Sequence, residues 1–298
     1  MDGDRVWSWK QEANPLQGLV AHSVQAPLRS KPSLSKTYYI GFEPKPKLSG
    51  ALLDIVNLHA NVEGKDVLKG IYLSIEPGEA HVLLGPNGSG KTTLVNAIMG
   101  SPKVRVVEGR IYFKGEDITG LPTHERVRMG IGVAFQHPPG IRGVKLRVLL
   151  EKLSSRLGKG ADLEKAALLV GMKELLDREV NVGFSGGELK RSEVLQLLVQ
   201  SPDLALFDEP DSGVDVENLA VIANAINELC GMNAKPSARI RSALLITHLS
   251  YILKYVKADR AHVLIDGRIA CSGKPAEIMD EVMEHGFGRC AECLRERM

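Results

Sequence analysis

A glycine-rich loop constrains this chain more than any other feature of its sequence. The run GPNGSGKTT at residues 85–93 follows a short apolar segment, AHVLLG, and leads into a helical pattern, TTLVNAIMG. A strand, a glycine loop and a helix in this order direct backbone N–H groups and a helix N-terminus toward phosphate oxygens. We therefore predict a nucleotide phosphate site. The residues expected to bind ATP are Gly85, Pro86, Asn87, Gly88, Ser89, Gly90, Lys91, Thr92 and Thr93.

Two side chains of this loop and two acids further along the chain predict a catalytic magnesium site. Lys91 supplies a cation for the terminal phosphates, and the Thr92 hydroxyl can bind Mg²⁺, which takes few protein ligands. The apolar run LALFDE at residues 204–209 ends in two carboxylates, at the edge where parallel sheets bind ligands. We expect Asp208 to hold Mg²⁺, directly or through water, and Glu209 to polarise the water that attacks the γ-phosphate.

Apolar segments alternate with helical patterns over most of the chain. Short buried strands are predicted at LALFDE, ALLIT and AHVLIDG, with a helix over 215–230 between the first two. Interleaved strands and helices predict an α/β fold with a mainly parallel sheet that is covered on both faces. Stretches typical of hairpins at 52–79 and 106–118 add an antiparallel β subdomain. Leu-, Lys- and Glu-rich residues at about 137–180 add a small helical subdomain.

The composition limits the classes of partner. The 298 residues carry a formal net charge of +2, which is not the basic excess of a nucleic-acid-binding protein. No apolar run approaches the roughly 18–20 residues that cross a bilayer, so we expect no direct membrane insertion. The four cysteines have no disulfide spacing, and they indicate free thiols in a reducing cytoplasm. They are Cys230, Cys271, Cys290 and Cys293.

The chain is expected to divide into three parts. Residues 1–49 hold five of the 15 prolines and little apolar periodicity, which predicts a disordered extension, although WSWK near its start could instead be a docking peptide. Residues 50–288 form the nucleotide-binding domain, and residues 289–298 a C-terminal tail. The tail carries C-x-x-C at Cys290 and Cys293, where two free thiols are favoured over half of a structural zinc site.

Six motifs occur in the order found in ATP-binding cassette (ABC) ATPases, and the chain resembles that family over about residues 51–288. They are the phosphate loop, Gln136, Phe184–Glu188, Asp208–Glu209, Ser212–Asp215 and His248. In that family two cassettes pair head to tail, and each ATP lies between the phosphate loop of one chain and the signature motif of the other. The resemblance therefore implies dimerisation with a second copy of this chain.

The resemblance also implies roles for individual residues. Gln136 would reach Mg²⁺ and the attacking water, and His248 would contact the γ-phosphate. Asp215, in the D-loop, would lie across the dimer seam near Glu209, and it also suits the N-cap of the following helix. The signature that would bind the partner's ATP comprises Phe184, Ser185, Gly186, Gly187 and Glu188.

Two stretches, REVNVGFSGGELKRSEVLQ and DEPDSGVDVENL, narrow the resemblance to the SufC branch of the family, the ATPases of iron–sulfur cluster assembly. Phe184 and Glu188 stand where transporter cassettes usually have Leu and Gln. Val62 stands near the position of the usual adenine-stacking aromatic. This resemblance implies an ATPase that remodels a SufB/SufD-like scaffold protein. The rival interpretation is the ATP-binding subunit of a membrane transporter whose permease is a separate chain.

Overall fold

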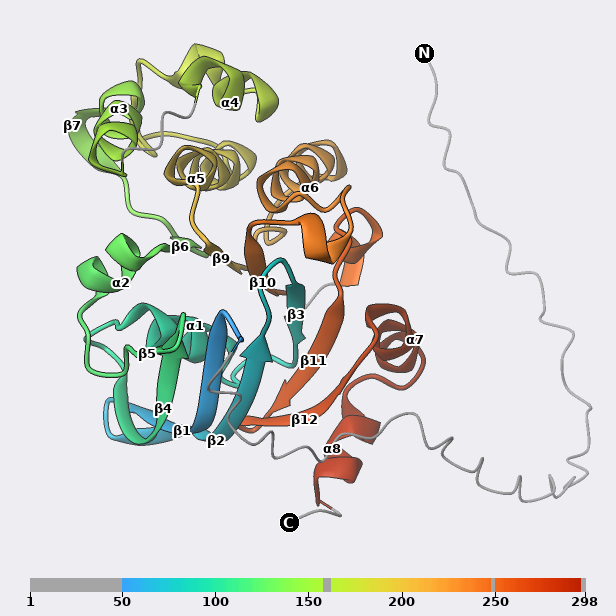
Figure 1. Cartoon of the computed structure of the whole chain (residues 1–298). Helices are drawn as coiled ribbons and strands as arrows, with labels where there is room; N and C mark the ends of the chain where they lie inside the picture. The colour runs from blue at the N-terminus through green and yellow to red at the C-terminus, as the bar shows by residue number, and fades with distance from the viewer. Residues whose placement is uncertain (1–49, 158–161, 248–249, 296–298) are drawn as a thin grey trace, which may run out of the picture. The chain divides into compact units, whose positions relative to one another are not determined.

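A six-stranded sheet carries the expected strand–loop–helix unit. The computed structural model describes residues 50–157, 162–247 and 250–295, and Figure 1 shows the strands of this sheet side by side. Their order is β12 (Arg268–Gly273), β11 (Arg260–Ile265), β3 (Ala80–Leu84), β10 (Ser242–Ile246), β9 (Leu204–Asp208) and β6 (Ile131–Ala134). From β11 to β6 all neighbours are parallel, and β12 runs antiparallel at the edge. The carboxyl ends of β3, β6, β9 and β10 therefore meet at one edge, where α/β proteins bind ligands.

Two further sheets are antiparallel. The larger has the order β2 (Lys65–Ile75), β1 (Leu53–Val62), β4 (Arg105–Phe113) and β5 (Glu116–Asp117). The smaller pairs β7 (Ile141–Lys145) with β8 (Glu179–Val180). The β7–β8 pair joins the two ends of the predicted helical subdomain, which fixes where that subdomain leaves and re-enters the sheet domain.

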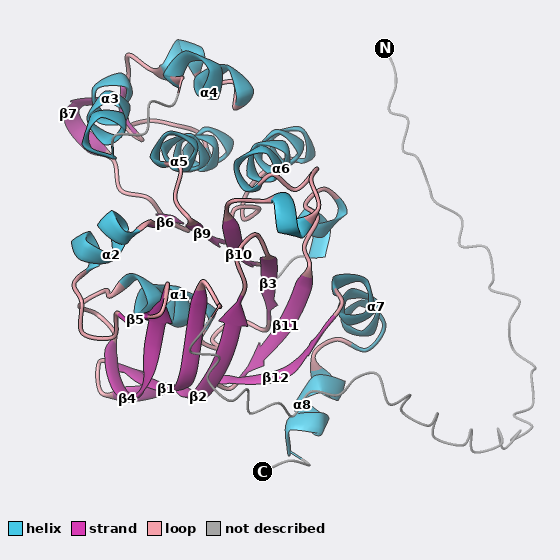
Figure 2. Ribbon diagram, viewed as in Figure 1, coloured by secondary structure: helices cyan, strands magenta, loops and turns pink. Residues whose placement is uncertain are grey.

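The helices are not gathered in one place. Helix α1 follows the phosphate loop, whereas α3, α4 and α5 lie together, away from the four-stranded antiparallel sheet (Figure 2). The helices are α1 (Lys91–Met99), α2 (Thr123–Met129), α3 (Leu146–Leu157), α4 (Leu163–Leu169), α5 (Gly186–Gln200), α6 (Val216–Cys230), α7 (Pro275–His285) and α8 (Gly288–Arg295). Single 3₁₀ turns add η2 (Lys173–Leu175), η3 (Pro236–Ala238) and η4 (Ser250–Lys254).

Each central strand is buried on both faces, which explains its unbroken apolar sequence. Along β9, Ala205 and Phe207 enter a core with helices α3 to α8, whereas Leu204 and Leu206 enter a second core with α1 and the antiparallel sheet. Successive side chains of a strand point to opposite faces, so one apolar run serves two cores. The predicted fold class is confirmed: a mainly parallel sheet, an antiparallel β subdomain and a small helical subdomain.

The C-terminal residues differ from the predicted tail. Residues 288–295 form α8. Cys290, at 5% exposure, belongs to the same core as Ile278 of α7 and Ala270 of β12. The sequence GFGRCAECLRERM has too few apolar residues to predict a buried helix, but Phe287, Ala291 and Leu294 supply a narrow apolar face. The predicted extension 1–49 lies outside the described residues. No helix in the described ranges is both long enough and apolar enough to span a bilayer.

Candidate functional site

The phosphate loop connects β3 to α1 and passes close to β11. Gly85, directly after β3, has φ +156°, and a Cβ at this position would lie 2.2 Å from the carbonyl oxygen of Leu264. Only glycine therefore fits here. The Ser89 hydroxyl is buried and finds no hydrogen-bond partner among the described residues. A buried, unsatisfied hydroxyl in a glycine loop at a helix N-terminus fits a bound phosphate group.

Lys91, the first residue of α1, folds back over the loop. Its Nζ donates to the carbonyl oxygens of Gly85 at 2.9 Å and Pro86 at 3.0 Å. Burial lowers the pKa of Lys91, and the carboxylates of Glu209 and Asp208 oppose that shift. The ammonium group thus lies between backbone oxygens and two acids, from where it can turn to donate to phosphate oxygens.

The predicted magnesium ligands are neighbours. The Thr92 hydroxyl donates to Asp208 Oδ1 at 3.2 Å, although the two residues are 116 positions apart in the chain. Burial raises the pKa of Asp208, the hydrogen bond from Thr92 lowers it, and the charge of Glu209 raises it further. A crowded pair of buried acids beside a hydroxyl suits a small hard cation such as Mg²⁺, which binds few protein oxygens.

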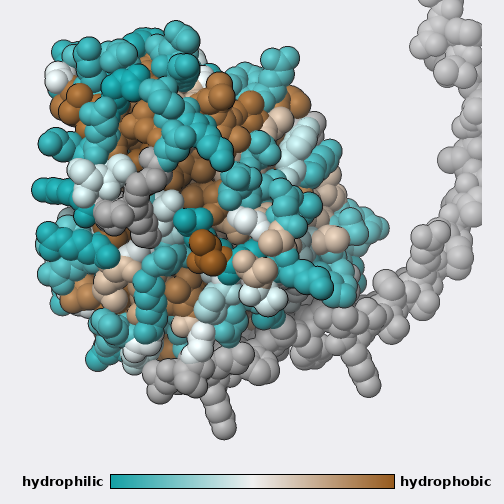
Figure 3. All heavy atoms as spheres, turned by 45° about the horizontal axis from the view of Figure 1, so that its top comes forward, coloured by the Kyte–Doolittle hydropathy of each residue, from teal (hydrophilic) through white to brown (hydrophobic). Residues whose placement is uncertain are grey.

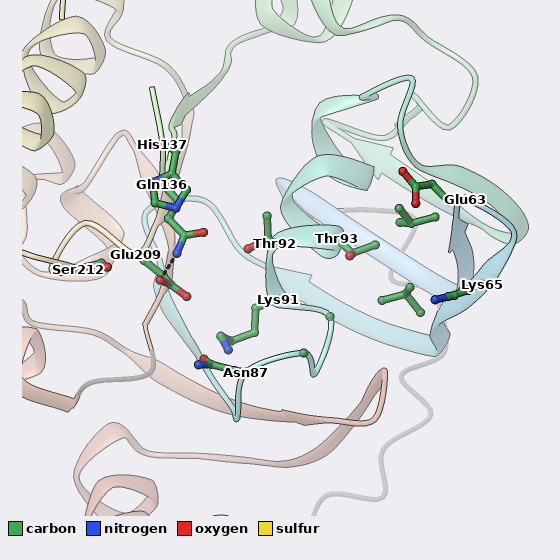
Figure 4. Close-up of a pocket in the computed structure, with 14 residues that line it drawn as sticks. Glu63, Lys65, Asn87, Lys91, Thr92, Thr93, Gln136, His137, Glu209 and Ser212 are labelled. Atoms are coloured by element: carbon green, nitrogen blue, oxygen red, sulfur yellow. Dashed lines mark hydrogen bonds between the residues drawn. The ribbon is translucent and has the colours of Figure 1, made fainter. Parts of the chain in front are cut away.

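Glu209 and Gln136 meet at the carboxyl ends of β9 and β6. Gln136 Nε2 donates to Glu209 Oε2, as the dashed line in Figure 4 shows. Glu209 is 6% exposed and has φ 51°, a left-handed backbone conformation that is costly for a residue other than glycine. Its N–H donates to the carbonyl oxygen of Ile246 on β10, which holds this conformation. The turn directs the carboxylate away from the sheet and toward Gln136.

Helix α5 supports the Gln136 segment. Lys190 Nζ donates to the backbone oxygen of Gln136 at 2.8 Å, and Glu193 Oε2 accepts from the Phe135 N–H at 3.1 Å. Burial lowers the pKa of Lys190 and raises the pKa of Glu193. Neither residue was predicted from the sequence. Their spacing could have indicated them, because two residues three positions apart lie on the same face of a helix, and here that face is covered by the core.

A cavity of about 750 Å³ opens beside the phosphate loop, a size that suits a nucleotide. Lys91, Gln136 and Glu209 come from three different elements and point into the same space (Figure 4). The lining also includes Val62 and Val67, so aliphatic side chains are available to contact a base. Exposed side chains of the lining that were not predicted from the sequence are Glu63, Lys65 and His137.

The signature segment forms the N-terminus of α5. Ser185 is the N-cap: its Oγ accepts from the Glu188 N–H at 3.4 Å, and Glu188 Oε2 accepts from the Ser185 N–H at 2.7 Å. Phe184 is buried, with the guanidinium carbon of Arg178 5.2 Å from its ring centre. None of residues 184–188 lines the cavity of its own chain. The exposed N-terminus of α5 lies outside this cavity, so an anion bound there would belong to another molecule.

The signature packs against the start of α6, which brings the D-loop beside it. A Cβ on Gly187 would lie 2.8 Å from Asn218, so glycine permits the close approach of α5 and α6. Asp215 is the N-cap of α6 and accepts from the Asn218 N–H at 2.8 Å. The predicted residues thus form two separate groups, one around the cavity and one at the start of α5 and α6. His248 lies outside the described residues.

Known proteins resemble this chain in sequence and in fold. The ABC transporter family model matches residues 68–212. A probable ATP-dependent transporter SufC from Escherichia coli is 41% identical over 254 residues, which cover 81% of this chain and 99% of that protein. The chain belongs to the ATP-binding cassette family. The resemblance to SufC is confirmed, and the cassette is an ATPase that binds and hydrolyses ATP.

Other relatives also belong to the ATP-binding cassette family. A probable ABC transporter ATP-binding protein from Streptococcus pyogenes is 38% identical over 82% of this chain and 96% of its own. Among solved structures, a nucleotide-free ATP-binding cassette from an ABC transporter matches with a TM-score of 0.66 and 26% identity, covering 82% of this chain and 98% of that one. The cassette fold therefore extends well beyond the 145-residue segment that the family model recognises (212 − 68 + 1).

Proposed function

We propose that this ABC ATPase is the SufC-type subunit of an iron–sulfur cluster assembly complex in the cytoplasm, where ATP-dependent pairing of two copies remodels a SufB/SufD-like scaffold protein. The similarity to SufC along nearly the whole length of the Escherichia coli protein supports this choice. Phe184 and Glu188 of the signature, which stand where transporter cassettes usually have Leu and Gln, support it as well.

The proposal of a head-to-tail dimer rests on the separation of the cavity residues from the signature residues at the start of α5. The cavity of one chain contains the phosphate loop, Gln136 and Glu209 but lacks its own signature segment, 184–188. The start of α5 at Gly186 is exposed, and none of residues 184–188 lines the cavity of this chain. Two copies related by a twofold axis would complete two equal sites, each with residues from both chains.

Within each site the cavity residues would divide the chemistry. The N–H groups of the phosphate loop and Lys91 would hold the β and γ phosphates, and Thr92 with Asp208 would hold Mg²⁺. When bound, the ion supplies charge stabilisation for phosphoryl transfer. Gln136 would orient the attacking water, and Glu209 Oε2 would accept its proton. His248, predicted from the sequence, would add a contact to the γ-phosphate.

A mixing experiment tests the composite site. Lys91→Ala disables the phosphate loop and Ser185→Arg disables the signature, so each variant should be inactive alone. A one-to-one mixture regains one complete site in each mixed dimer, which predicts about a quarter of the wild-type ATPase rate. The matched control mixes Lys91→Ala with Glu209→Gln, which damage the same half and should stay inactive together. If the first mixture also stays inactive while mixed dimers form, each site is built from one chain and the proposal is wrong.

The partner is tested through the surface beside Gln136. Phe135, Ile141 and Val148 are 45%, 39% and 44% exposed, and Figure 3 shows hydrophobic areas among the hydrophilic side chains on the face it displays. We propose that these three residues contact the scaffold. The protein should be purified from its native extract with Mg-ATP, both unchanged and as Val148→Asp, with Leu168→Asp as an exposed control. Recovery of a soluble β-helical scaffold that Val148→Asp alone loses supports the proposal. Recovery of a multi-spanning membrane protein identifies a transporter subunit instead.

A further inference from the structure

Two cysteines from different elements lie side by side at the edge of the six-stranded sheet. Cys271 belongs to the edge strand β12, and Cys290 belongs to α8. Neither forms a disulfide, and the Cys271 thiol donates to Cys290 Sγ across 3.2 Å. A disulfide bond is about 2.0 Å long, so the two sulfur atoms must approach each other by about 1.2 Å to form one.

The packing of α8 fixes the position of these sulfurs. Cys290 is 5% exposed, and Ala291 and Leu294 pack against the same core. Arg289 Nη1 makes an ion pair with Glu281 Oε1 of α7 at 3.2 Å, which ties the start of α8 to the preceding helix. The two thiols are therefore held together by the surrounding core and do not depend on a chance approach of two surface side chains.

The two thiols differ in exposure. Cys271 is partly exposed, whereas Cys290 is buried. The hydrogen bond from Cys271 lowers the pKa of Cys290, and Arg289 adds to this effect, while burial and Glu281 oppose it. Cys230 provides a contrast, since burial raises its pKa to about 12 and leaves it unreactive. A partly exposed thiol in contact with a buried second thiol is the arrangement of an attacking and a resolving cysteine.

We propose that Cys271 and Cys290 form a redox-active dithiol site whose substrates are low-molecular-weight disulfides, and that its oxidation ties α8 covalently to β12. The Cys271 thiolate attacks one sulfur of RSSR. The bond between the two R-bearing sulfurs breaks, a mixed disulfide forms at Cys271, and RS⁻ leaves and takes up the Cys271 proton. The Cys290 thiolate then attacks Cys271 Sγ and displaces the second RS⁻, which takes up the Cys290 proton. Two thiols and RSSR thus become one protein disulfide and two RSH.

The consequence of oxidation is confined to the C-terminal part of the chain. The closed loop runs from 271 to 290 and includes α7, whereas the nucleotide cavity is lined by residues between 62 and 212. Because reducing compartments keep structural disulfides rare, a bond formed here would be reversible and would report the thiol–disulfide balance. Its effect is to hold α8 on the sheet edge without changing the residues that bind ATP.

Equilibration of the full chain in anaerobic glutathione–glutathione disulfide buffers tests the site. Remaining thiols are alkylated after acid quenching, and tryptic cleavage after Arg289 puts Cys271 and Cys290 on separate peptides. A Cys293→Ser background leaves one cysteine on the second peptide, so a cross-linked pair has a single assignment. We expect this cross-link to form as the buffer becomes oxidising and to revert with excess glutathione, while Cys230 stays unlinked.

Thermal unfolding supplies a second measurement. Closing a loop of this length should raise the melting temperature of the oxidised chain by roughly 5–10 °C. Cys271→Ser, at a partly exposed position, should abolish both the cross-link and the rise while the reduced protein keeps its melting temperature. Three outcomes would overturn the proposal: no cross-link even in glutathione disulfide alone, a Cys290–Cys293 bridge in the wild-type chain, or stoichiometric zinc that is lost in Cys271→Ser.

Discussion

Replacing Arg126 by methionine should destabilise the fold strongly, because this guanidinium is buried and bonds only to backbone oxygens. Arg126, on α2, is 2% exposed. Its Nη1 donates to Ala97 O at 2.7 Å and Ile98 O at 2.8 Å, the last turn of α1. Its Nη2 and Nε donate to Thr119 O and Leu121 O at 2.9 and 2.8 Å. The side chain therefore caps the helix that begins at the phosphate loop.

The size of the loss follows from these four bonds. Burial lowers the pKa of Arg126 to about 10, so the group is still charged at neutral pH. Hydrogen bonds from a charged donor contribute about 1.5–3 kcal/mol each, and removing the guanidinium leaves four carbonyl oxygens to be satisfied elsewhere. The replaced charge no longer needs to be desolvated, which returns part of this sum. We expect a net loss of about 3–5 kcal/mol in the free energy of unfolding.

Equilibrium unfolding in urea measures this loss, and Arg128→Met is the matched control. Arg128 is exposed two residues further along α2, so its replacement should change stability by no more than about 0.5 kcal/mol. The melting temperature of Arg126→Met should fall by roughly 6–20 °C, and its affinity for ATP should fall because α1 holds Lys91. A loss below about 1 kcal/mol, or one equal to that of the control, would show that desolvation cancels the hydrogen bonds, and the reasoning would be refuted.

Two further predictions concern catalysis and pH. Glu209→Gln should lower the ATPase rate by a factor of about 10²–10⁴ and leave ATP binding intact. The control Glu63→Gln, at an exposed position of the cavity, should keep both the ATPase rate and ATP binding. Equal ATPase rates for the wild type and Glu209→Gln would exclude Glu209 as the base. Burial lowers the pKa of His262 well below its usual value, with help from the charge of His81. The folded state therefore keeps this ring neutral, whereas the unfolded state takes up a proton below about pH 6.5. The free energy of unfolding should therefore fall as the pH drops through that value, by up to about 1.4 kcal/mol per pH unit. Urea unfolding at pH 7.5 and 5.5 should show a smaller fall for His262→Gln than for the exposed control His124→Gln, and an undiminished fall in His262→Gln would contradict the assignment.

The fold and the cavity were accessible from the sequence because their signals are local. The glycine loop, the apolar strands and the acids at the end of β9 each follow from residues that are neighbours in the chain. The antiparallel and helical subdomains follow from changes in periodicity. The phosphate loop, Gln136 and Glu209 lie around one cavity, as the motif order leads one to expect.

What the sequence did not predict depends on contacts between distant segments. In the sequence Arg126 is indistinguishable from a surface arginine, but in the structure α1 packs against it. Lys190 and Glu193 likewise have the sequence of a solvated helix face, but in the structure they bind the Gln136 segment. The approach of Cys271 to Cys290 depends on α8 turning back onto β12, which follows no repeat or spacing in the chain. In each case a polar side chain is buried by tertiary packing, whereas periodicity reports only where apolar side chains go.

The left-handed backbone of Glu209 sets stability against activity at a single position. A glutamate held at φ 51° costs about 1–2 kcal/mol relative to a residue that favours this conformation, such as glycine or asparagine. Selection for thermal tolerance alone would therefore favour glycine or asparagine at position 209, and the resulting proteins would be more stable but would lack the proposed catalytic base. Under the proposed mechanism, the glutamate at this position lowers the stability of the fold and in return places a carboxylate at the nucleotide cavity.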